Sequence, residues 1–316
     1  MIDINKIRNN VEQIACSTGE FLKEQQAQLH QSDIELKGTR NFVTHIDTEA
    51  EKMLVKKLGE LIPGATFLTE EGTVTYVDGQ YTWIIDPLDG TTNYVHGDTP
   101  FSVSVALMKD REIILGVVYD PVADELFSAS AKGKVTLNGN SFKTSLHQTL
   151  TNGYIGFGIP YSLDDRGEKI LKNAVGQFRK CSFRIKGSAA IEICYVACGR
   201  SDAYFHSGLS PWDVAAGTFI LECAGGTCTD FSGGRNYIFN KELVASNGKI
   251  HAAPAPVSEN QYGASASHPP MTAPHAIEIM LMNESSFLSV SLFSGIRYPS
   301  RYPIAASSSS VLMTWQ

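Results

Sequence analysis

Four strand-like segments follow one another between residues 82 and 139, and no helical pattern separates them. They read "TWIID", "FSVSVALM", "EIILGVVYD" and "ELFSASAKGKVTLNG". In the second segment Val103, Val105 and Leu107 alternate with other residues, which is the spacing of a strand, and the fourth segment reads as a hairpin. Consecutive strands without helices between them predict an antiparallel sheet.

Helices are predicted before this strand-rich stretch. Apolar residues recur at helical spacing from Ile4 to Leu22, which indicates an amphipathic helix at the start of the chain. A second helix is predicted from Thr48 to Ile62, with Asp47 as its N-cap and with Pro63-Gly64 ending it.

Strands and helices alternate after residue 150. "GYIGFGI", "SFRIK", "DAYFH" and "GGTCTDF" read as strands, and helices are predicted at 165–178, from Ser188 to Cys198 and from Trp212 to Ala224. This alternation fits a mixed sheet covered by helices. The sequence therefore predicts an α+β protein with two sub-domains, residues 1–145 and 146–250, and with the functional site at their junction.

The composition changes near residue 250. Residues 251–316 hold seven of the 13 prolines and clusters such as "SASHPP" and "AASSSS", and they have no periodic pattern. Such a composition is typical of a poorly ordered tail.

Charge and composition limit the classes of molecule that this protein can bind. The net charge of -7 offers no basic surface to nucleic acid or to an anionic membrane, so we expect small molecules or proteins as partners. Asp3, Lys6 and Arg8 interrupt any signal peptide, and no segment reaches the roughly 18 apolar residues of a membrane span. A cytoplasmic protein is predicted. The six cysteines form no Cys-x-x-Cys pair, which argues against a zinc site.

The segment "WIIDPLDGTTNY" carries the clearest chemical signal. Asp86 and Asp89 follow an apolar run, and two carboxylates this close repel each other unless a cation lies between them. Oxygen ligands suit Mg²⁺ or Mn²⁺, and Pro87 would stiffen the turn that holds them. Gly90 and Thr91 then offer backbone N–H groups and a hydroxyl that suit a phosphate.

Other carboxylates stand at the ends of predicted elements and can converge on the same point. Glu70 follows the strand "ATFLT", Asp213 begins the helix of "SPWDVAAG", and Asp47 begins the second helix. Each has a structural alternative: Asp-Pro and Asp-Gly are common in turns, "TEEG" can be a solvated loop, and Asp213 can cap a helix.

Four motifs together resemble the inositol monophosphatases, a family of Mg²⁺-dependent, lithium-sensitive phosphatases. They are "FVTHIDTEAE", "TEEG", "DPLDGTTNY" and "WDVAAG", and their order and spacing are similar to those of the family over residues 1 to about 250. The resemblance implies a layered α/β/α/β/α sandwich with an antiparallel N-terminal half and a mixed C-terminal half. It also implies a homodimer and two or three Mg²⁺ ions in each site.

The resemblance also assigns roles. It implies that Glu70, Asp86 and the Leu88 carbonyl hold one metal ion, and that Asp86, Asp89 and Asp213 hold a second; Glu70 would also touch a weaker third ion. Phosphate would bind at Asp89, Gly90 and Thr91. Glu70 would accept a proton from the attacking water, which Thr91 and Asp47 would orient.

The resemblance implies a small phosphorylated metabolite as the substrate, and inositol monophosphate is the first expectation. Family members that act on inositol phosphates commonly carry a glutamate where this chain has His206, and Ser188 and Ala189 match other substrate-wall positions. Fructose 1,6-bisphosphate, the 2′-phosphate of NADP and 3′-phosphoadenosine phosphate are alternatives. An alternative of another class is a regulatory binding protein that keeps the fold.

Overall fold

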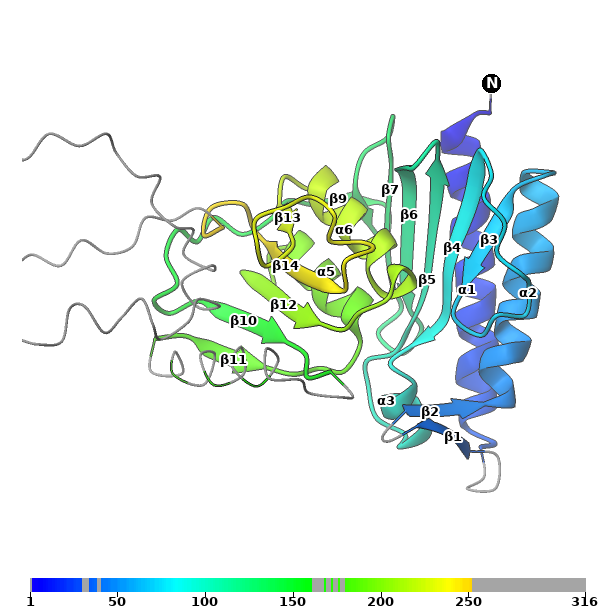
Figure 1. The fold of residues 1–316 in the computed structure, drawn as a ribbon, viewed down its shortest axis with the longest axis horizontal. Helices are drawn as coiled ribbons and strands as arrows, with labels where there is room; N and C mark the ends of the chain where they lie inside the picture. Colours follow the sequence, from blue (N-terminus) through cyan, green and yellow to red (C-terminus); the bar gives the residue numbers. More distant parts are fainter. Residues whose placement is uncertain are drawn as a thin grey trace, which may run out of the picture. The chain divides into compact units, whose positions relative to one another are not determined.

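Two large β-sheets organise the chain (Figure 1). The computed structural model describes residues 2–29, 34–38, 41–160 and 180–251, together with residues 168, 172 and 176, and all of them belong to one unit, Met1–Met282. The predicted tail, apart from His251, and most of the helix predicted at 165–178 lie outside these residues.

The first sheet has seven strands in the order β3-β4-β5-β6-β7-β8-β9. They are β3 (Thr66–Thr69), β4 (Tyr81–Asp89), β5 (Ser102–Lys109), β6 (Glu112–Asp120), β7 (Glu125–Ser130), β8 (Thr136–Leu137) and β9 (Asn140–Ser141). From β4 onward every pair is antiparallel, and β7 and β8 form the predicted hairpin. β3 pairs with β4 in parallel, so the sheet as a whole is mixed and not purely antiparallel. The connection over residues 70–80 returns the chain to the end of the sheet at which β3 began.

The second sheet has five strands in the order β11-β10-β12-β14-β13. They are β10 (Tyr154–Phe157), β11 (Ser182–Arg184), β12 (Ala203–Ser207), β13 (Thr227–Thr229) and β14 (Glu242–Ser246). β10 runs parallel to both its neighbours, whereas β14 is antiparallel to both of its own. The predicted mixed sheet is confirmed. β14 was not predicted, because four of its five residues are buried and it shows no alternation. A separate ribbon pairs β1 (Ile34–Gly38) with β2 (Asn41–Thr44).

The helices form layers with the sheets. They are α1 (Ile4–Gln26), α2 (His45–Leu61), α3 (Thr91–Val95), α5 (Ala189–Ala197) and α6 (Pro211–Cys223). α1 and α2 pack against β4 to β7, and α5 and α6 contact strands of both sheets (Figure 1). These contacts form four layers of the predicted α/β/α/β/α sandwich. None of the described helices combines the length and the apolar content that crossing a membrane requires.

The start of α2 differs from the prediction. β2 ends at Thr44 and the helix begins at once at His45, so Asp47 lies inside the first turn and is not the N-cap. Asp47 is also buried. Its carboxylate is directed toward α3, where it contacts Thr91.

Small residues bring α6 close to the first sheet. A Cβ atom on Gly116 of β6 would lie 2.7 Å from the carbonyl oxygen of Ala216, and a Cβ on Gly217 would lie 3.1 Å from Ile193 of α5. The helix thus approaches the sheet on one side and α5 on the other at near-contact distance. This packing fixes the N-terminus of α6, which carries Asp213.

Candidate active site

A cavity of about 940 Å³ is lined by residues of both sheets and of the helices between them. The lining includes ten of the eleven residues that the sequence singled out: Glu70, Asp86, Leu88, Asp89, Gly90, Thr91, Ser188, Ala189, His206 and Asp213. The eleventh, Asp47, lies behind Thr91. The fold therefore brings together residues that lie more than a hundred positions apart in the sequence.

A β-bulge aims the two aspartates of "DPLD" at one point. Asp86 pairs with Ser104 and Asp89 pairs with Ser102, so three steps along β4 match two steps along β5. Residues three apart on a regular strand would point to opposite faces, and the extra residue removes that difference. The Asp86 carboxylate also accepts the N–H of Leu88 at 2.9 Å. The stiff turn predicted around Pro87 is thus a bulge within a strand.

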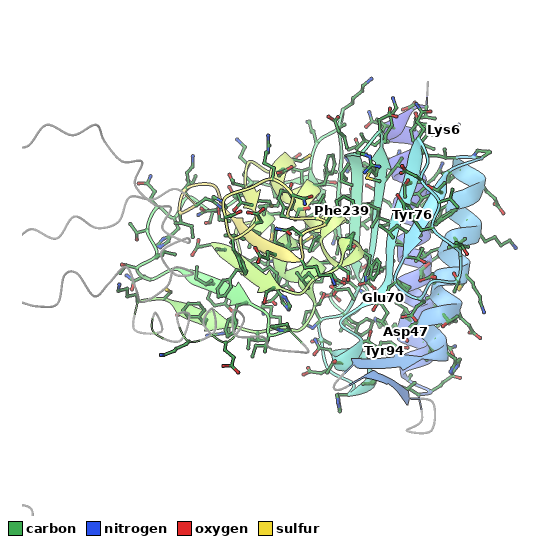
Figure 2. The ribbon with its side chains drawn as sticks, viewed as in Figure 1. Lys6, Asp47, Glu70, Tyr76, Tyr94 and Phe239 are labelled. Carbon is green, nitrogen blue, oxygen red and sulfur yellow. The ribbon has the colours of Figure 1, made fainter. Side chains whose placement is uncertain are left out.

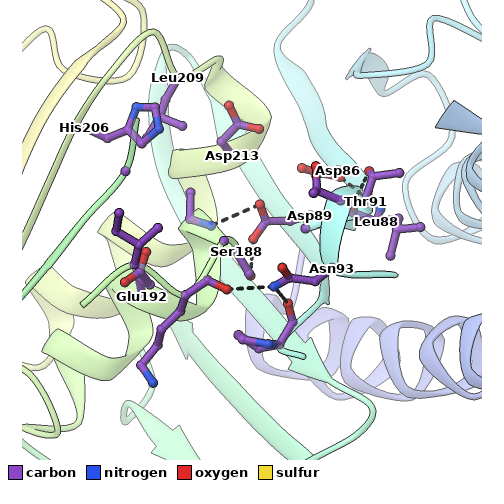
Figure 3. A pocket seen from close by; sticks show the side chains of 18 of the residues that line it. Asp86, Leu88, Asp89, Thr91, Asn93, Ser188, Glu192, His206, Leu209 and Asp213 are labelled. Atoms are coloured by element: carbon purple, nitrogen blue, oxygen red, sulfur yellow. Dashed lines mark hydrogen bonds between the residues drawn. The ribbon is translucent and has the colours of Figure 1, made fainter. Parts of the chain in front are cut away.

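Asp213 completes a cluster with Asp86 and Asp89. Each of the three side chains offers an oxygen atom, and these oxygens lie within 4.8 Å of one another (Figure 3). Asp213 also accepts the backbone N–H of Ser210 at 2.6 Å in a capping box. The structural alternative for Asp213, helix capping, is therefore correct, and the same side chain still belongs to the cluster.

Burial and mutual repulsion dominate the electrostatics of this cluster. Burial raises the pKa of Asp86 well above its ordinary range, and the neighbouring Glu70, Asp89 and Asp213 raise it further. Burial and the charge of Asp89 raise the pKa of Asp213 to about 7. Clustered carboxylates that resist ionisation in the absence of a cation are stabilised in their ionised form when a cation binds between them. An all-oxygen donor set suits a hard divalent ion. The residues present fit a divalent metal.

The N-terminus of α5 holds Asp89 in place. Its carboxylate accepts the Ser188 hydroxyl and the backbone N–H groups of Ala189 and Ala190, the last two at 3.1 and 2.9 Å. These donors oppose the effect of burial, which raises the pKa of Asp89. Ser188 and Ala189 line the pocket as expected, but their polar groups are directed to Asp89.

Three further predicted residues surround the bulge. The side chain of Glu70 is hydrogen-bonded to Asp86. The Thr91 hydroxyl donates to the Leu88 carbonyl at 3.0 Å and lies 3.4 Å from an Asp47 oxygen. Figure 2 shows Glu70, Asp47 and Tyr94 of α3 at the same end of the seven-stranded sheet. The Leu88 carbonyl keeps a second lone pair for another partner.

Gly90 is required by the turn between β4 and α3. Its φ of +96° lies in the left-handed region, and a Cβ atom there would lie 3.0 Å from the Pro100 carbonyl oxygen and 3.3 Å from that of Gly187. A side chain would be strained and crowded. The backbone of Gly90 packs closely against Pro100 and Gly187, and Gly90 and Thr91 line the pocket.

Glu51 is a polar residue of this region that we did not single out from the sequence. It is fully buried, and its carboxylate accepts four hydrogen bonds at 2.6 to 2.9 Å. One comes from the hydroxyl of Thr69 at the end of β3, and three come from the loop that follows: from the Glu71 N–H and from both the N–H and the hydroxyl of Thr73. This loop carries Glu70. The sequence signal was present, because Glu51 lies one helical turn after Asp47, on the same face of α2.

We expect Glu51→Ala to weaken binding of Mg²⁺ by roughly 10- to 100-fold, the range typical of residues that orient a metal ligand. The end of β3 and the loop after it would lose the acceptor of four hydrogen bonds, and Glu70 would lose its fixed position. Calorimetric titration of the metal-free protein with Mg²⁺ measures this. Glu49→Ala on the exposed face of the same helix is the matched control. Equal metal affinities in the two variants would contradict a positioning role for Glu51.

Glu192 is a buried acid of the pocket lining that we did not single out from the sequence. It lies one turn after Ser188, the N-cap of α5, and only 4% of its surface is exposed. Burial raises the pKa of Glu192 to about 8, although Lys186 lowers it through its charge and a backbone hydrogen bond. The spacing of four from Ser188 was the signal that could have identified it.

The fold and the carboxylate cluster together define a class: layered α+β proteins with a divalent-metal site in a pocket between their layers. Comparisons with known proteins agree with this class. The sequence profile described as the inositol monophosphatase family matches residues 3–261, slightly beyond the limit expected from the sequence. This chain belongs to the inositol monophosphatase family.

Individual relatives support the same assignment. An inositol-1-monophosphatase of Mesorhizobium japonicum is 36% identical over 249 residues, which cover 78% of this chain and 93% of that protein. The Nus factor SuhB of Escherichia coli K12 is 38% identical over 217 residues, covering 68% of this chain and 81% of that protein. The crystal structure of the extragenic suppressor protein suhB of Bartonella henselae superposes with a TM-score of 0.72 at 34% identity, covering 77% of this chain and 94% of that one.

Proposed function

We propose that this protein is a Mg²⁺-dependent phosphomonoesterase that acts on small phosphorylated metabolites. The observation that carries the proposal is the convergence of three carboxylates, two buried and one half-buried, with oxygens within 4.8 Å, on a pocket that also exposes the turn at Gly90 and Thr91. Glu70, Asp86, Asp89, Asp213 and the Leu88 carbonyl would hold two or three Mg²⁺ ions, for which Mn²⁺ can substitute. The N–H groups of Gly90 and Thr91 would bind the phosphate.

The reaction needs positive charge and alignment, because a phosphate ester is anionic and its alkoxide is a poor leaving group. Bound divalent ions supply the charge and lower the pKa of water. Glu70, which lies beside Asp86, would accept the proton of the attacking water. The Thr91 hydroxyl, which lies between the Leu88 carbonyl and Asp47, would help to orient that water.

Inositol monophosphate is the first substrate to test, because the Mesorhizobium relative is an inositol-1-monophosphatase. The alternatives are fructose 1,6-bisphosphate, NADP and 3′-phosphoadenosine phosphate. Phosphate release from each should be compared in one assay, with Mg²⁺, with Mn²⁺ and with added Li⁺. We expect Mg²⁺-dependent, Li⁺-inhibited hydrolysis of inositol monophosphate at the highest kcat/KM. Absence of metal-dependent release from every ester would overturn the proposed activity.

A regulatory binding role is a second candidate, since the Escherichia coli relative is named a Nus factor. The intact carboxylate cluster favours catalysis, and the net charge of -7 disfavours direct binding of nucleic acid. The two candidates differ in their metal dependence, because a partner-binding surface would survive the loss of a metal ligand. We further propose a cytoplasmic homodimer, which cell fractionation and size-exclusion chromatography of the full chain would check.

A further inference from the structure

One wall of the pocket is polar and lies away from the carboxylate cluster. Glu192 of α5 and His206 of β12 form it, on the side of the pocket opposite Asp86 and Thr91 (Figure 3). Neither side chain belongs to the proposed metal site. A substrate whose phosphate lies at Gly90 and Thr91 would extend its organic part toward this wall.

Two glycines of the strand segment at β10 make room for this wall. A Cβ atom on Gly156 would lie 2.8 Å from Oε1 of Glu192, and a Cβ on Gly158 would lie 1.8 Å from Cδ2 of His206. Both distances are shorter than real Cβ contacts, so no other residue fits at either position without displacing a polar side chain. The alternate glycines of "GFG" thus leave the space that Glu192 and His206 occupy.

Glu192 is buried and His206 is half-buried, and both have hydrogen-bonding capacity left over. Burial lowers the pKa of His206 to about 4, so the imidazole is neutral at pH 7. Its Nδ1 atom is buried and has no hydrogen-bond partner among the residues that the structure describes. A carboxyl group whose pKa is near 8 is largely protonated at pH 7 and can both donate and accept. Buried polar groups of this kind call for a polar partner.

Charge limits what that partner can be. Lys186 is the one lysine or arginine among the described residues that line the pocket, and its ammonium group lies 5.3 Å from the centre of the Tyr195 ring. The other ionisable groups of the lining, apart from His206 and the tyrosines, are carboxylic acids. A second phosphate would meet little positive charge beside Glu192, whereas an uncharged hydroxyl can pair with a carboxyl group or an imidazole.

We propose that Glu192 is a specificity-determining residue, whose carboxyl group hydrogen-bonds a hydroxyl of the organic part of the phosphate ester. The inference rests on the proposed function and extends it to a residue that the four motifs do not contain. A purely structural role is the competing explanation, since Glu192 also accepts a hydrogen bond from the backbone of Lys186, next to the loop at Gly187 that packs on Gly90.

Two variants and two substrates separate these explanations. Glu192→Ala removes the hydrogen-bonding group, and Glu192→Gln keeps the shape and a neutral donor and acceptor. Each is assayed with Mg²⁺ on inositol 1-phosphate, or on whichever hydroxyl-bearing ester the unmodified protein cleaves fastest, and on p-nitrophenyl phosphate, which has no hydroxyl. Glu222→Ala, an exposed acid on α6, is the matched control.

We expect Glu192→Ala to lower kcat/KM for the hydroxyl-bearing ester by about 10- to 100-fold, mainly through KM, because the substrate loses a buried hydrogen bond. Hydrolysis of p-nitrophenyl phosphate by Glu192→Ala should change by no more than about 2-fold. Glu192→Gln should retain most of the preference of the unmodified protein for the hydroxyl-bearing ester. Equal losses on both esters would show a structural role and overturn the inference. Failure of the proposed function is distinguishable, because the unmodified protein would then hydrolyse neither ester.

Discussion

Replacing Asp86 by asparagine (D86N) is expected to abolish most phosphatase activity, lowering kcat by at least about 100-fold, which is the upper range for residues that only orient a ligand. Asp86 is the acid at the centre of the group, because it lies beside Glu70 and within reach of both Asp89 and Asp213. Asparagine offers the metal ions one neutral oxygen, whereas the aspartate would offer two oxygens that share a negative charge. The fold should persist, since the substitution removes repulsion among buried acids and keeps the side-chain oxygen that accepts the N–H of Leu88.

Three measurements together test this expectation. Turnover of the best ester should fall, calorimetric titration should show weakened Mg²⁺ binding, and the Tm of the metal-free variant should equal or exceed that of the unmodified protein. Asp98→Asn is the matched control, because Asp98 also lines the pocket but is exposed and lies outside the cluster. Near-normal turnover of the Asp86 variant at ordinary Mg²⁺ concentrations would contradict the assignment of the metal site.

Local patterns were sufficient to predict most of the framework. The alternation in "FSVSVALM" and the apolar runs around it fixed the strands of the first sheet, and the helix predicted from Trp212 to Ala224 differs from α6 by one residue at each end. The bulge in β4 was less accessible, because the sequence shows two aspartates three apart and only the pairing with Ser102 and Ser104 shows how they come to face one point.

The residues that escaped prediction act through contacts distant in sequence. Glu51 acquires its role from a loop about twenty residues away, and Glu192 becomes part of the pocket only because Gly156 and Gly158 leave room for it and His206. Glu51 lies inside α2 and Glu192 lies in the first turn of α5 but four residues after its N-cap, so neither directly follows or begins an element, which was the signal used for the other carboxylates. Tertiary packing decides whether an acid inside a helix is solvated or buried, and a single sequence does not display that packing.

The acids of the pocket, those of the proposed metal site and Glu192, destabilise the protein when no metal is bound, and this gives a pH dependence with a defined sign. The pKa of Asp213 is raised by burial and by Asp89 to about 7, and that of Glu192 is raised by burial to about 8. A carboxyl group whose pKa is higher in the folded state binds more protons there than in the unfolded chain, so the stability it contributes is lost as pH rises through the folded-state pKa. Asp86 and Asp89 act in the same direction.

His206 opposes this trend only at lower pH. Burial lowers its pKa from 6.5 to about 4, so below pH 6.5 the unfolded chain binds a proton at His206 that the folded protein does not. The free energy of unfolding therefore falls as pH drops below 6.5, and His206 has little further effect above that value. The window from pH 6.5 to pH 8 therefore isolates the carboxyl groups. In that window we expect the Tm of the protein in EDTA to fall by roughly 5 °C as pH rises, since each pKa unit is worth about 1.4 kcal/mol.

Saturating Mg²⁺ should reverse the slope, because metal ions bind the ionised carboxylates and compete with protons for them. Thermal melts in EDTA and in Mg²⁺ at half-unit steps of pH measure both trends. Asp213→Asn should flatten the EDTA curve, as it removes one of the titrating acids, whereas Asp98→Asn should leave it unchanged. A Tm in EDTA that stays level or rises between pH 6.5 and pH 8 would mean that Asp86, Asp89, Asp213 and Glu192 do not bind more protons in the metal-free folded state than in the unfolded chain. Metal binding would then relieve no repulsion among the carboxylates, and the burial of the cluster would not contribute to metal affinity.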